Sequence, residues 1–155
     1  MIDDFLVRWT FVRSMTTEFL VGASDECLDL RPEKSFMTIR EQAAHLCEVQ
    51  GVHQLALSQE PVDMARKPEF GPATLDREAI LECLAARDRQ LLELLDALRP
   101  DPAAFRLDWY GAEIGVAGFG MVFIQHESIH HGQWAAYAAL GGHARPIGWL
   151  LNWGL

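Results

Sequence analysis

The stretch from Val116 to Leu140 is the most strongly helical part of the chain, and residues 126–130 in its middle read His-Glu-Ser-Ile-His. On a helix, side chains four positions apart lie about 40° apart around the axis and one turn apart along it, so His126 and His130 face the same way. Two neutral imidazoles in this arrangement can bind one divalent metal ion. We therefore expect a helix that carries a metal-binding face.

Three further segments show the three- and four-residue spacing of apolar side chains that is typical of helices. They cover residues 2–20, 38–58 and 74–98, and almost nothing in the chain is typical of a strand. Thr38 and Glu41 form the pattern of a capping box where the second segment begins. Longer connections follow the first two segments, and the tail after residue 142 is rich in Trp and Leu. We predict a single domain over residues 1–155, an all-α four-helix bundle with a crossover connection and a tail that packs back on it.

The composition excludes several classes of function. The net charge is −9 and the thirteen basic residues are scattered, whereas a nucleic-acid site needs clustered Lys and Arg. The three cysteines lie far apart and include no C-x-x-C pair, so neither a disulfide framework nor a thiolate zinc site is indicated. No stretch approaches ~18 uninterrupted apolar residues, and the first residues are acidic, unlike a signal peptide. We expect a cytoplasmic protein that binds neither nucleic acid nor membrane.

A helical wheel of residues 116–140 sorts the histidines of this segment. His126 and His130 fall on the apolar face, and His131 falls on a flank where we expect it to be solvated. The other members of the apolar face are Phe119, Val122, Phe123, Ile129, Gln133, Trp134, Tyr137 and Leu140. One buried histidine is most often a hydrogen-bonded core residue. Two of them on one apolar face must both be desolvated, and a shared metal ion would satisfy both.

As a zinc-protease signature, the motif would make Glu127 a general base, but the third metal ligand of such an enzyme is missing. No Asp or Glu follows His130, and the longer protease motif requires Gly and His where the chain has Gln133 and Ala136. The overlapping E-x-x-H of residues 127–130 is half of a di-iron site, but the chain contains no second E-x-x-H. Both interpretations are therefore weak.

The remaining candidates for a third ligand are His45 and His53, both in the predicted helix 38–58. His45 falls at the edge of the buried face of that helix, which suits a site open to solvent. His53 lies closer to the apolar stripe, where a structural role is the simpler interpretation. The wheel does not choose between them. Cys47 projects away from His45, so it should not reach the site as a fourth ligand.

Two stretches, taken together, resemble a known family. Residues 38–46 read Thr-Ile-Arg-Glu-Gln-Ala-Ala-His-Leu, preceded by Arg-Pro at 31–32, and residues 126–133 read His-Glu-Ser-Ile-His-His-Gly-Gln. In this order and spacing they are similar to the DinB/YfiT-like family, and the similarity covers nearly the whole chain. The resemblance implies a four-helix bundle with a divalent metal held by three histidines, which correspond here to His45, His126 and His130.

Members of that family include enzymes that use low-molecular-weight thiols, hydrolases and proteins without known activity. The resemblance thus implies a metal-dependent hydrolase, or a thiol-dependent transferase or isomerase, that acts on a small molecule. Zinc and nickel are the first candidates for the metal, which would activate a water or a thiol. Glu127 would be a base or would orient a ligand, unless it is a solvated flank residue, and Gln133 and Trp134 would contact the substrate.

The family is also often dimeric, and an apolar tail suits a homodimer. The residues that we expect to take part are Trp149, Leu150, Leu151 and Trp153. The alternative to an enzyme is a non-catalytic dimeric bundle in which the metal is structural or absent.

Overall fold

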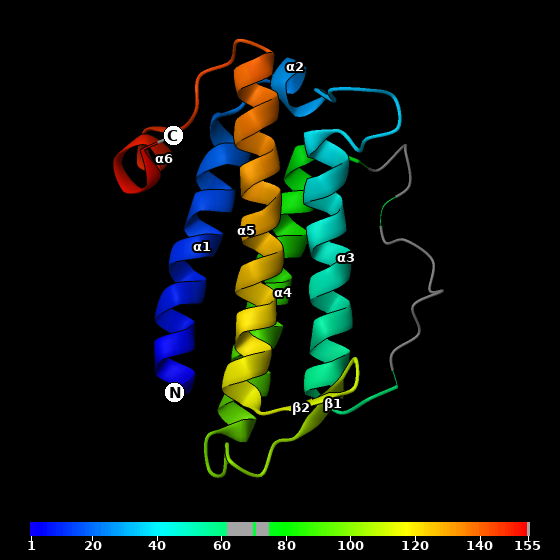
Figure 1. Ribbon diagram of the computed structural model, residues 1–155, viewed down its shortest axis with the longest axis vertical. Coiled ribbons are helices and arrows are strands. Elements are labelled where there is room, and N and C mark those ends of the chain that lie inside the picture. The colour runs from blue at the N-terminus through cyan, green and yellow to red at the C-terminus, as the bar shows by residue number, and fades with distance from the viewer. Residues whose placement is uncertain (62–69, 71–74, 155) are drawn as a thin grey trace.

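The structure is a computed structural model that describes residues 1–61, 70 and 75–154, and four long helices dominate it (Figure 1). The elements are α1 (Ile2–Gly22), α2 (Asp25–Leu28), α3 (Ile39–Leu57), α4 (Arg77–Leu98), β1 (Leu107–Trp109), β2 (Ala112–Ile114), α5 (Val116–Leu140) and α6 (Ile147–Trp153). The four predicted helical segments correspond to α1, α3, α4 and α5, so the all-α prediction is confirmed. None of the described helices is both long enough and apolar enough to cross a membrane.

The helix boundaries follow from capping side chains. At the start of α3, Thr38 Oγ1 accepts from Glu41 N (3.1 Å) and Glu41 Oε2 accepts from Thr38 N (2.7 Å), which confirms the predicted capping box. At the start of α4, Asp76 accepts from the backbone N–H of Ala79. The prediction placed the beginning of this helix at residue 74, which lies outside the described residues.

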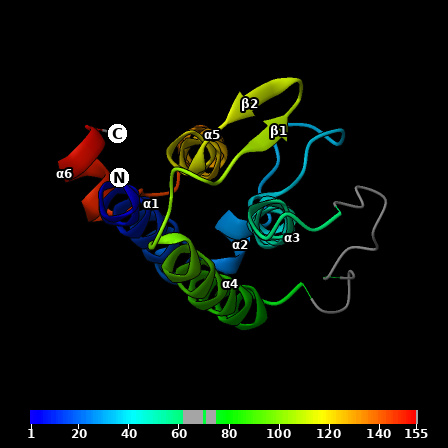
Figure 2. The same cartoon turned by 90° about the horizontal axis from the view of Figure 1, so that it is seen from below.

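Viewed along the bundle, the four long helices occupy four corners (Figure 2). The helix α5 packs against α1 and α3, and α4 packs against the same two helices from the opposite corner. Helices α1 and α3 follow each other among the long helices but lie on a diagonal, so the chain crosses the end of the bundle between them. The predicted crossover is therefore present, and it leaves α3 and α5 side by side.

Two small elements were not predicted. The helix α2 is a single turn, with Ser24 as its N-cap. The strands β1 and β2 form an antiparallel hairpin whose turn residues Tyr110 and Gly111 have φ angles of 52° and 82°. Positive φ at both turn residues matches the twist of a two-residue hairpin, and glycine accepts it without a steric cost. Periodicity could not find elements of three or four residues.

The core consists of two apolar clusters separated by a polar layer. The cluster nearer the tail contains Phe19, Leu46, Trp134 and Trp149, and the other contains Phe5, Trp9, Phe119 and Phe123. Between them, each long helix contributes at least one polar side chain that is buried or largely buried, among them Arg13, Gln50, Asp88 and Glu127. The tail helix α6 packs back through Trp149, which has no exposed surface, as predicted.

Two glycines of α5 provide a matched test of this packing. A Cβ at Gly120 would lie 2.7 Å from Cδ2 and 3.0 Å from Cγ of the buried Phe5 ring, whereas a Cβ at Gly132 would meet nothing within 4 Å. Overpacking costs about 1–3 kcal/mol, and replacing a helical glycine by alanine gains about 1 kcal/mol. In urea unfolding we expect Gly120→Ala to destabilise the protein and Gly132→Ala to stabilise it by about 0.5–1 kcal/mol. Stabilisation by both substitutions would contradict the described contact with Phe5.

Candidate metal centre

Three histidines converge between α3 and α5. His45 comes from α3, and His126 and His130 come from successive turns of α5. One ring nitrogen of each lies within 4.8 Å of the others, and the ring centroids are 4.9–5.5 Å apart. This geometry selects His45 as the third member of the set, a choice that the helical wheel left open.

The three imidazoles are neutral at pH 7. Burial, with smaller contributions from neighbouring histidines, lowers the pKa of His126 to about 3 and that of His130 to about 4. Burial also lowers the pKa of His45. A neutral imidazole offers a nitrogen lone pair, which is the form that binds a metal ion. His130 is buried while His45 and His126 keep part of their surface exposed, so the set has one side open to solvent. The donor set and its protonation therefore fit a divalent metal.

Gln42 fixes the orientation of His130. Its Oε1 accepts from Nε1 of Trp134 (3.1 Å) and lies 3.0 Å from Nδ1 of His130, and its Nε2 donates to Met37 O (3.3 Å). Because the indole N–H can only donate, the amide oxygen must face it. The same oxygen then accepts a hydrogen bond from Nδ1–H of His130, which leaves Nε2 of that ring as the metal-binding atom. Gln42 was not predicted as a site residue.

Comparison with known proteins agrees with this geometry. The sequence profile of the DinB superfamily matches residues 8–134. This chain belongs to the DinB superfamily. The structure is similar to the crystal structure of a DinB-like protein from Bacillus cereus ATCC 10987, with a TM-score of 0.69 and 19% sequence identity over 93% of this chain and 95% of that one. At that identity the likeness shows a shared fold. No curated protein matches the chain.

The two expected substrate contacts of this DinB-superfamily chain lie in different places. Gln133 is partly exposed and lies beside His130. Its side chain partly offsets the lowering of the pKa of His130, and the buried Oε1 of Gln133 has no hydrogen-bond partner among the described residues. Trp134 has no exposed surface and donates to Gln42 from behind His130. This placement argues against contact between Trp134 and a substrate and makes it a support for the site.

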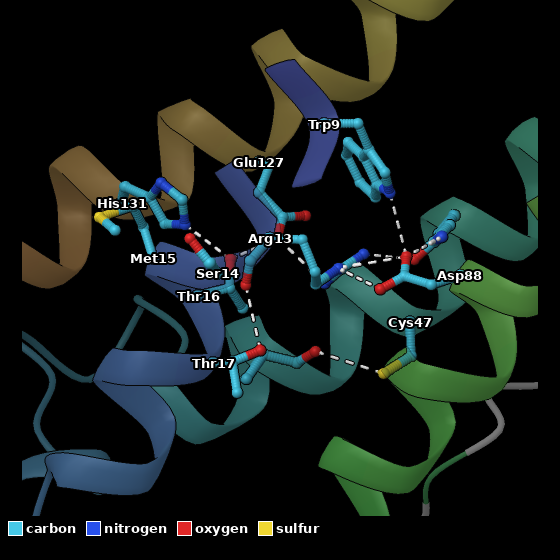
Figure 3. A network of polar contacts seen from close by, with 12 residues as sticks. Trp9, Arg13, Ser14, Met15, Thr16, Thr17, Cys47, Asp88, Glu127 and His131 are labelled. Atoms are coloured by element: carbon cyan, nitrogen blue, oxygen red, sulfur yellow. Dashed lines mark hydrogen bonds and ion pairs between the residues drawn. The ribbon is translucent and has the colours of Figure 1, made fainter. Parts of the chain in front are cut away.

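His131 is buried, so the expectation that it is solvated is wrong. It is 2% exposed, and its Nε2 lies 2.7 Å from Thr16 Oγ1 (Figure 3). Its ring packs against Trp149 and Trp153. Burial lowers its pKa to about 3, with a further contribution from Arg13. The wheel failed because α5 is covered on two sides. The buried arc extends from the α3 side to the α1 side, and His131 lies on the latter.

Glu127 also points toward α1 (Figure 3). It is 2% exposed, so it is not a solvated flank residue. Its Oε1 forms an ion pair with Nη1 of Arg13 (2.9 Å) and accepts a short hydrogen bond from Thr16 Oγ1. Burial raises the pKa of Glu127, while Arg13 and Thr16 act in the opposite direction. The carboxylate does not belong to the group formed by the three histidines, so the geometry gives no support to its expected role as general base.

The two other residues considered as ligands stay outside the set. His53 is buried among Trp109, Phe119 and Phe123, its ring centroid is 6.0 Å from that of His126, and burial lowers its pKa to about 4. Cys47 is fully buried, and its Sγ donates toward Ala43 O and Ile80 O. His53 therefore packs as a structural residue. Cys47 projects away from His45, as the helical wheel predicted.

Gln42 can be tested by a double-mutant cycle. Gln42→Leu removes the shared acceptor of His130 and Trp134, and an unsatisfied buried donor costs about 1–3 kcal/mol. We expect Gln42→Leu to lower the free energy of urea unfolding by about 2 kcal/mol or more. In a Trp134→Phe background the same substitution should cost less, because one of the two donors is already gone. If the free-energy changes of the two substitutions were fully additive, the conclusion that Gln42 is the shared acceptor of His130 and Trp134 would be contradicted.

Proposed function

We propose that this DinB-superfamily protein binds a divalent metal ion, zinc or nickel, through His45, His126 and His130 and uses it as an enzyme on a small molecule. The observation that carries the proposal is the convergence of three neutral imidazoles on one point with a side open to solvent. Catalytic zinc sites have three protein ligands and leave a position for water or substrate. Family membership agrees with the metal site, and the reaction that we propose is hydrolysis or transfer or isomerisation with a low-molecular-weight thiol.

A metal bound here would lower the pKa of a coordinated water or thiol and so supply a hydroxide or thiolate nucleophile near neutral pH. The chain contributes the orientation of the ligands, because Gln42 holds Nδ1 of His130 and directs its Nε2 into the site. Gln133 is the residue best placed to contact a substrate. Its Oε1 can accept a hydrogen bond, and the side chain lies next to His130.

A non-catalytic bundle with a structural metal is the alternative. A structural zinc site is closed by four protein ligands. In the part of the chain that the structure describes, the histidine group has three members, and Cys47 is directed elsewhere. The open side therefore favours an enzyme over a structural site.

Metal binding can be tested with single substitutions and a matched control. We expect His45→Ala, His126→Ala and His130→Ala each to weaken binding of Zn²⁺ or Ni²⁺ by more than the roughly 10–100-fold that loss of an outer partner costs. Titration calorimetry and elemental analysis of the purified protein measure this, and circular dichroism checks the helical fold. His53→Phe, which removes a nearby buried imidazole outside the set, should keep the wild-type affinity. If the three alanine variants bind metal as well as the wild type, the proposed site is wrong.

We also propose that the protein is a homodimer through the outer face of α1 and α5. Glu127 is the only charged residue of α5, and it is buried, so the exposed side of this 25-residue helix carries no charge. A helix that lacks charge on its exposed side is typically covered. The apolar side chains exposed beside it are Val7, Phe11, Met121, Leu150 and Leu151. Two copies of a chain with a net charge of −9 repel each other least at a face without net charge, and Asp4 and Arg8, which line the hollow beside Val7 and Met121, carry opposite charges.

The expected role of the tail in this contact changes in one respect. Trp149 has no exposed surface, and its Nε1 donates to Met15 O (3.0 Å) within the same chain. It therefore anchors α6, and Leu150 and Leu151 remain available to a partner.

A charge at this face should separate the subunits. We expect Met121→Glu to convert the protein to a monomer in size-exclusion chromatography with light scattering, because it buries an unpaired charge in the interface. Leu92→Glu is the matched control. Leu92 is 47% exposed, close to the 53% of Met121, but lies on α4 and should leave the dimer intact. A monomeric wild type, or dissociation by both substitutions alike, would contradict the proposed face.

A further inference from the structure

A cavity lies between α1 and α4, on the edge of the bundle opposite the three histidines. Its volume is about 780 Å³, within the range of small-molecule pockets. Trp9 and Arg13 are buried and form its floor, and Val21 and Leu92 are 60% and 47% exposed at its rim. None of the proposed metal ligands lines it.

Among the described residues of its wall, Arg13 is the one cationic side chain, and it is already paired with two carboxylates. Nε of Arg13 donates to Asp88 Oδ1 (3.3 Å), Nη1 forms the ion pair with Glu127 (2.9 Å) and Nη2 donates to Gln50 Oε1 (2.5 Å). Figure 3 shows Arg13 between Glu127 and Asp88, with Trp9 donating to the same Asp88. An anionic ligand would have to compete with two carboxylates for this guanidinium.

The other polar groups with known partners in the wall act as acceptors. Ser14 Oγ donates to Phe11 O (2.7 Å) and Thr17 Oγ1 donates to Arg13 O (3.0 Å), so both hydroxyls use their proton within α1 and keep free lone pairs. Asp88 and Glu18 contribute carboxylates. Oδ1 of Asp88 already accepts from Trp9, Arg13 and Gln50, whereas Glu18 accepts only from the backbone N–H of Gly148 (2.9 Å) among the described residues, so Glu18 is the main negative group left for a ligand. The lining thus has two carboxylates against one guanidinium that is already paired.

We propose that this cavity binds a small organic ammonium ion with an apolar body. Such a ligand places N–H donors and a positive charge against Asp88, Glu18 and the hydroxyls, and its apolar part against Leu6, Trp9 and Leu92. A carboxylate ligand of the same shape would be repelled, because it would meet hydrogen-bond acceptors and a net negative charge. A neutral alcohol of the same shape would lack the attraction between the positive charge and the carboxylates. The proposal is independent of the metal site.

The charge preference can be tested with three probes that share one chain length: octylammonium, octanoate and 1-octanol. Titration calorimetry with the full chain should show octylammonium binding at least tenfold more tightly than either of the others. Because an amine can also coordinate a metal, each titration is made with the protein as purified and again with saturating Zn²⁺. Binding in the cavity is unchanged by Zn²⁺. Equal or tighter binding of octanoate, no saturable binding of octylammonium, or binding that requires Zn²⁺ would overturn the proposal.

Matched surface variants locate the binding. Leu92→Lys places a positive charge at the rim of the cavity, and we expect it to weaken octylammonium binding at least tenfold. Phe36→Lys adds the same charge at a position that is 51% exposed in the connection before α3, outside the cavity lining, and should leave the affinity within twofold of the wild type. Both side chains reach solvent, so the fold tolerates either change. Equal effects of the two substitutions would place the ligand elsewhere and contradict the assignment.

Discussion

The ion pair between Arg13 and Glu127 is the interaction on which the rest of the structure depends. It joins α1 to α5 in the middle of the bundle, between two apolar clusters, and it extends through Gln50 and Asp88 to the other two long helices. A buried charge without its partner costs several kcal/mol, so this layer permits one axial register and one rotation of each helix. Apolar contacts alone would tolerate sliding by a turn.

That constraint reaches the candidate metal centre through α5. Glu127 follows His126 in the chain, and His131, which shares Thr16 with Glu127, follows His130. With these two residues held toward α1, the preceding histidines are turned toward α3, where His45 completes the set. The pattern H-E-x-x-H-H thus encodes two neighbouring faces of one helix, about 100° apart. One face offers metal ligands and the other locks the helix in place.

Much of the fold was predictable, because helical periodicity and caps are local properties. The ends of α5 and the capping box of Thr38 follow from residues a few positions apart. The burial of His131 could not be predicted in the same way, since a wheel assumes one covered side and α5 has two. Ile129 and Leu140 show the converse: both were expected on the apolar face, and they are 54% and 77% exposed. The choice of His45 over His53 required knowledge that α3 lies beside α5, which is a tertiary fact. Gln42 carries no local signal, because its role depends on two donors that lie 88 and 92 residues away.

The central claim is that three histidines bind a metal and leave one side open. X-ray absorption spectroscopy of the zinc-loaded protein tests it most directly, because it counts ligands and distinguishes nitrogen or oxygen from sulfur. The account predicts three imidazole nitrogens at about 2.0–2.1 Å and at least one further light-atom ligand that exogenous anions can replace. A sulfur ligand at about 2.3 Å, fewer than three imidazoles, or a set that exogenous ligands leave unchanged would contradict it.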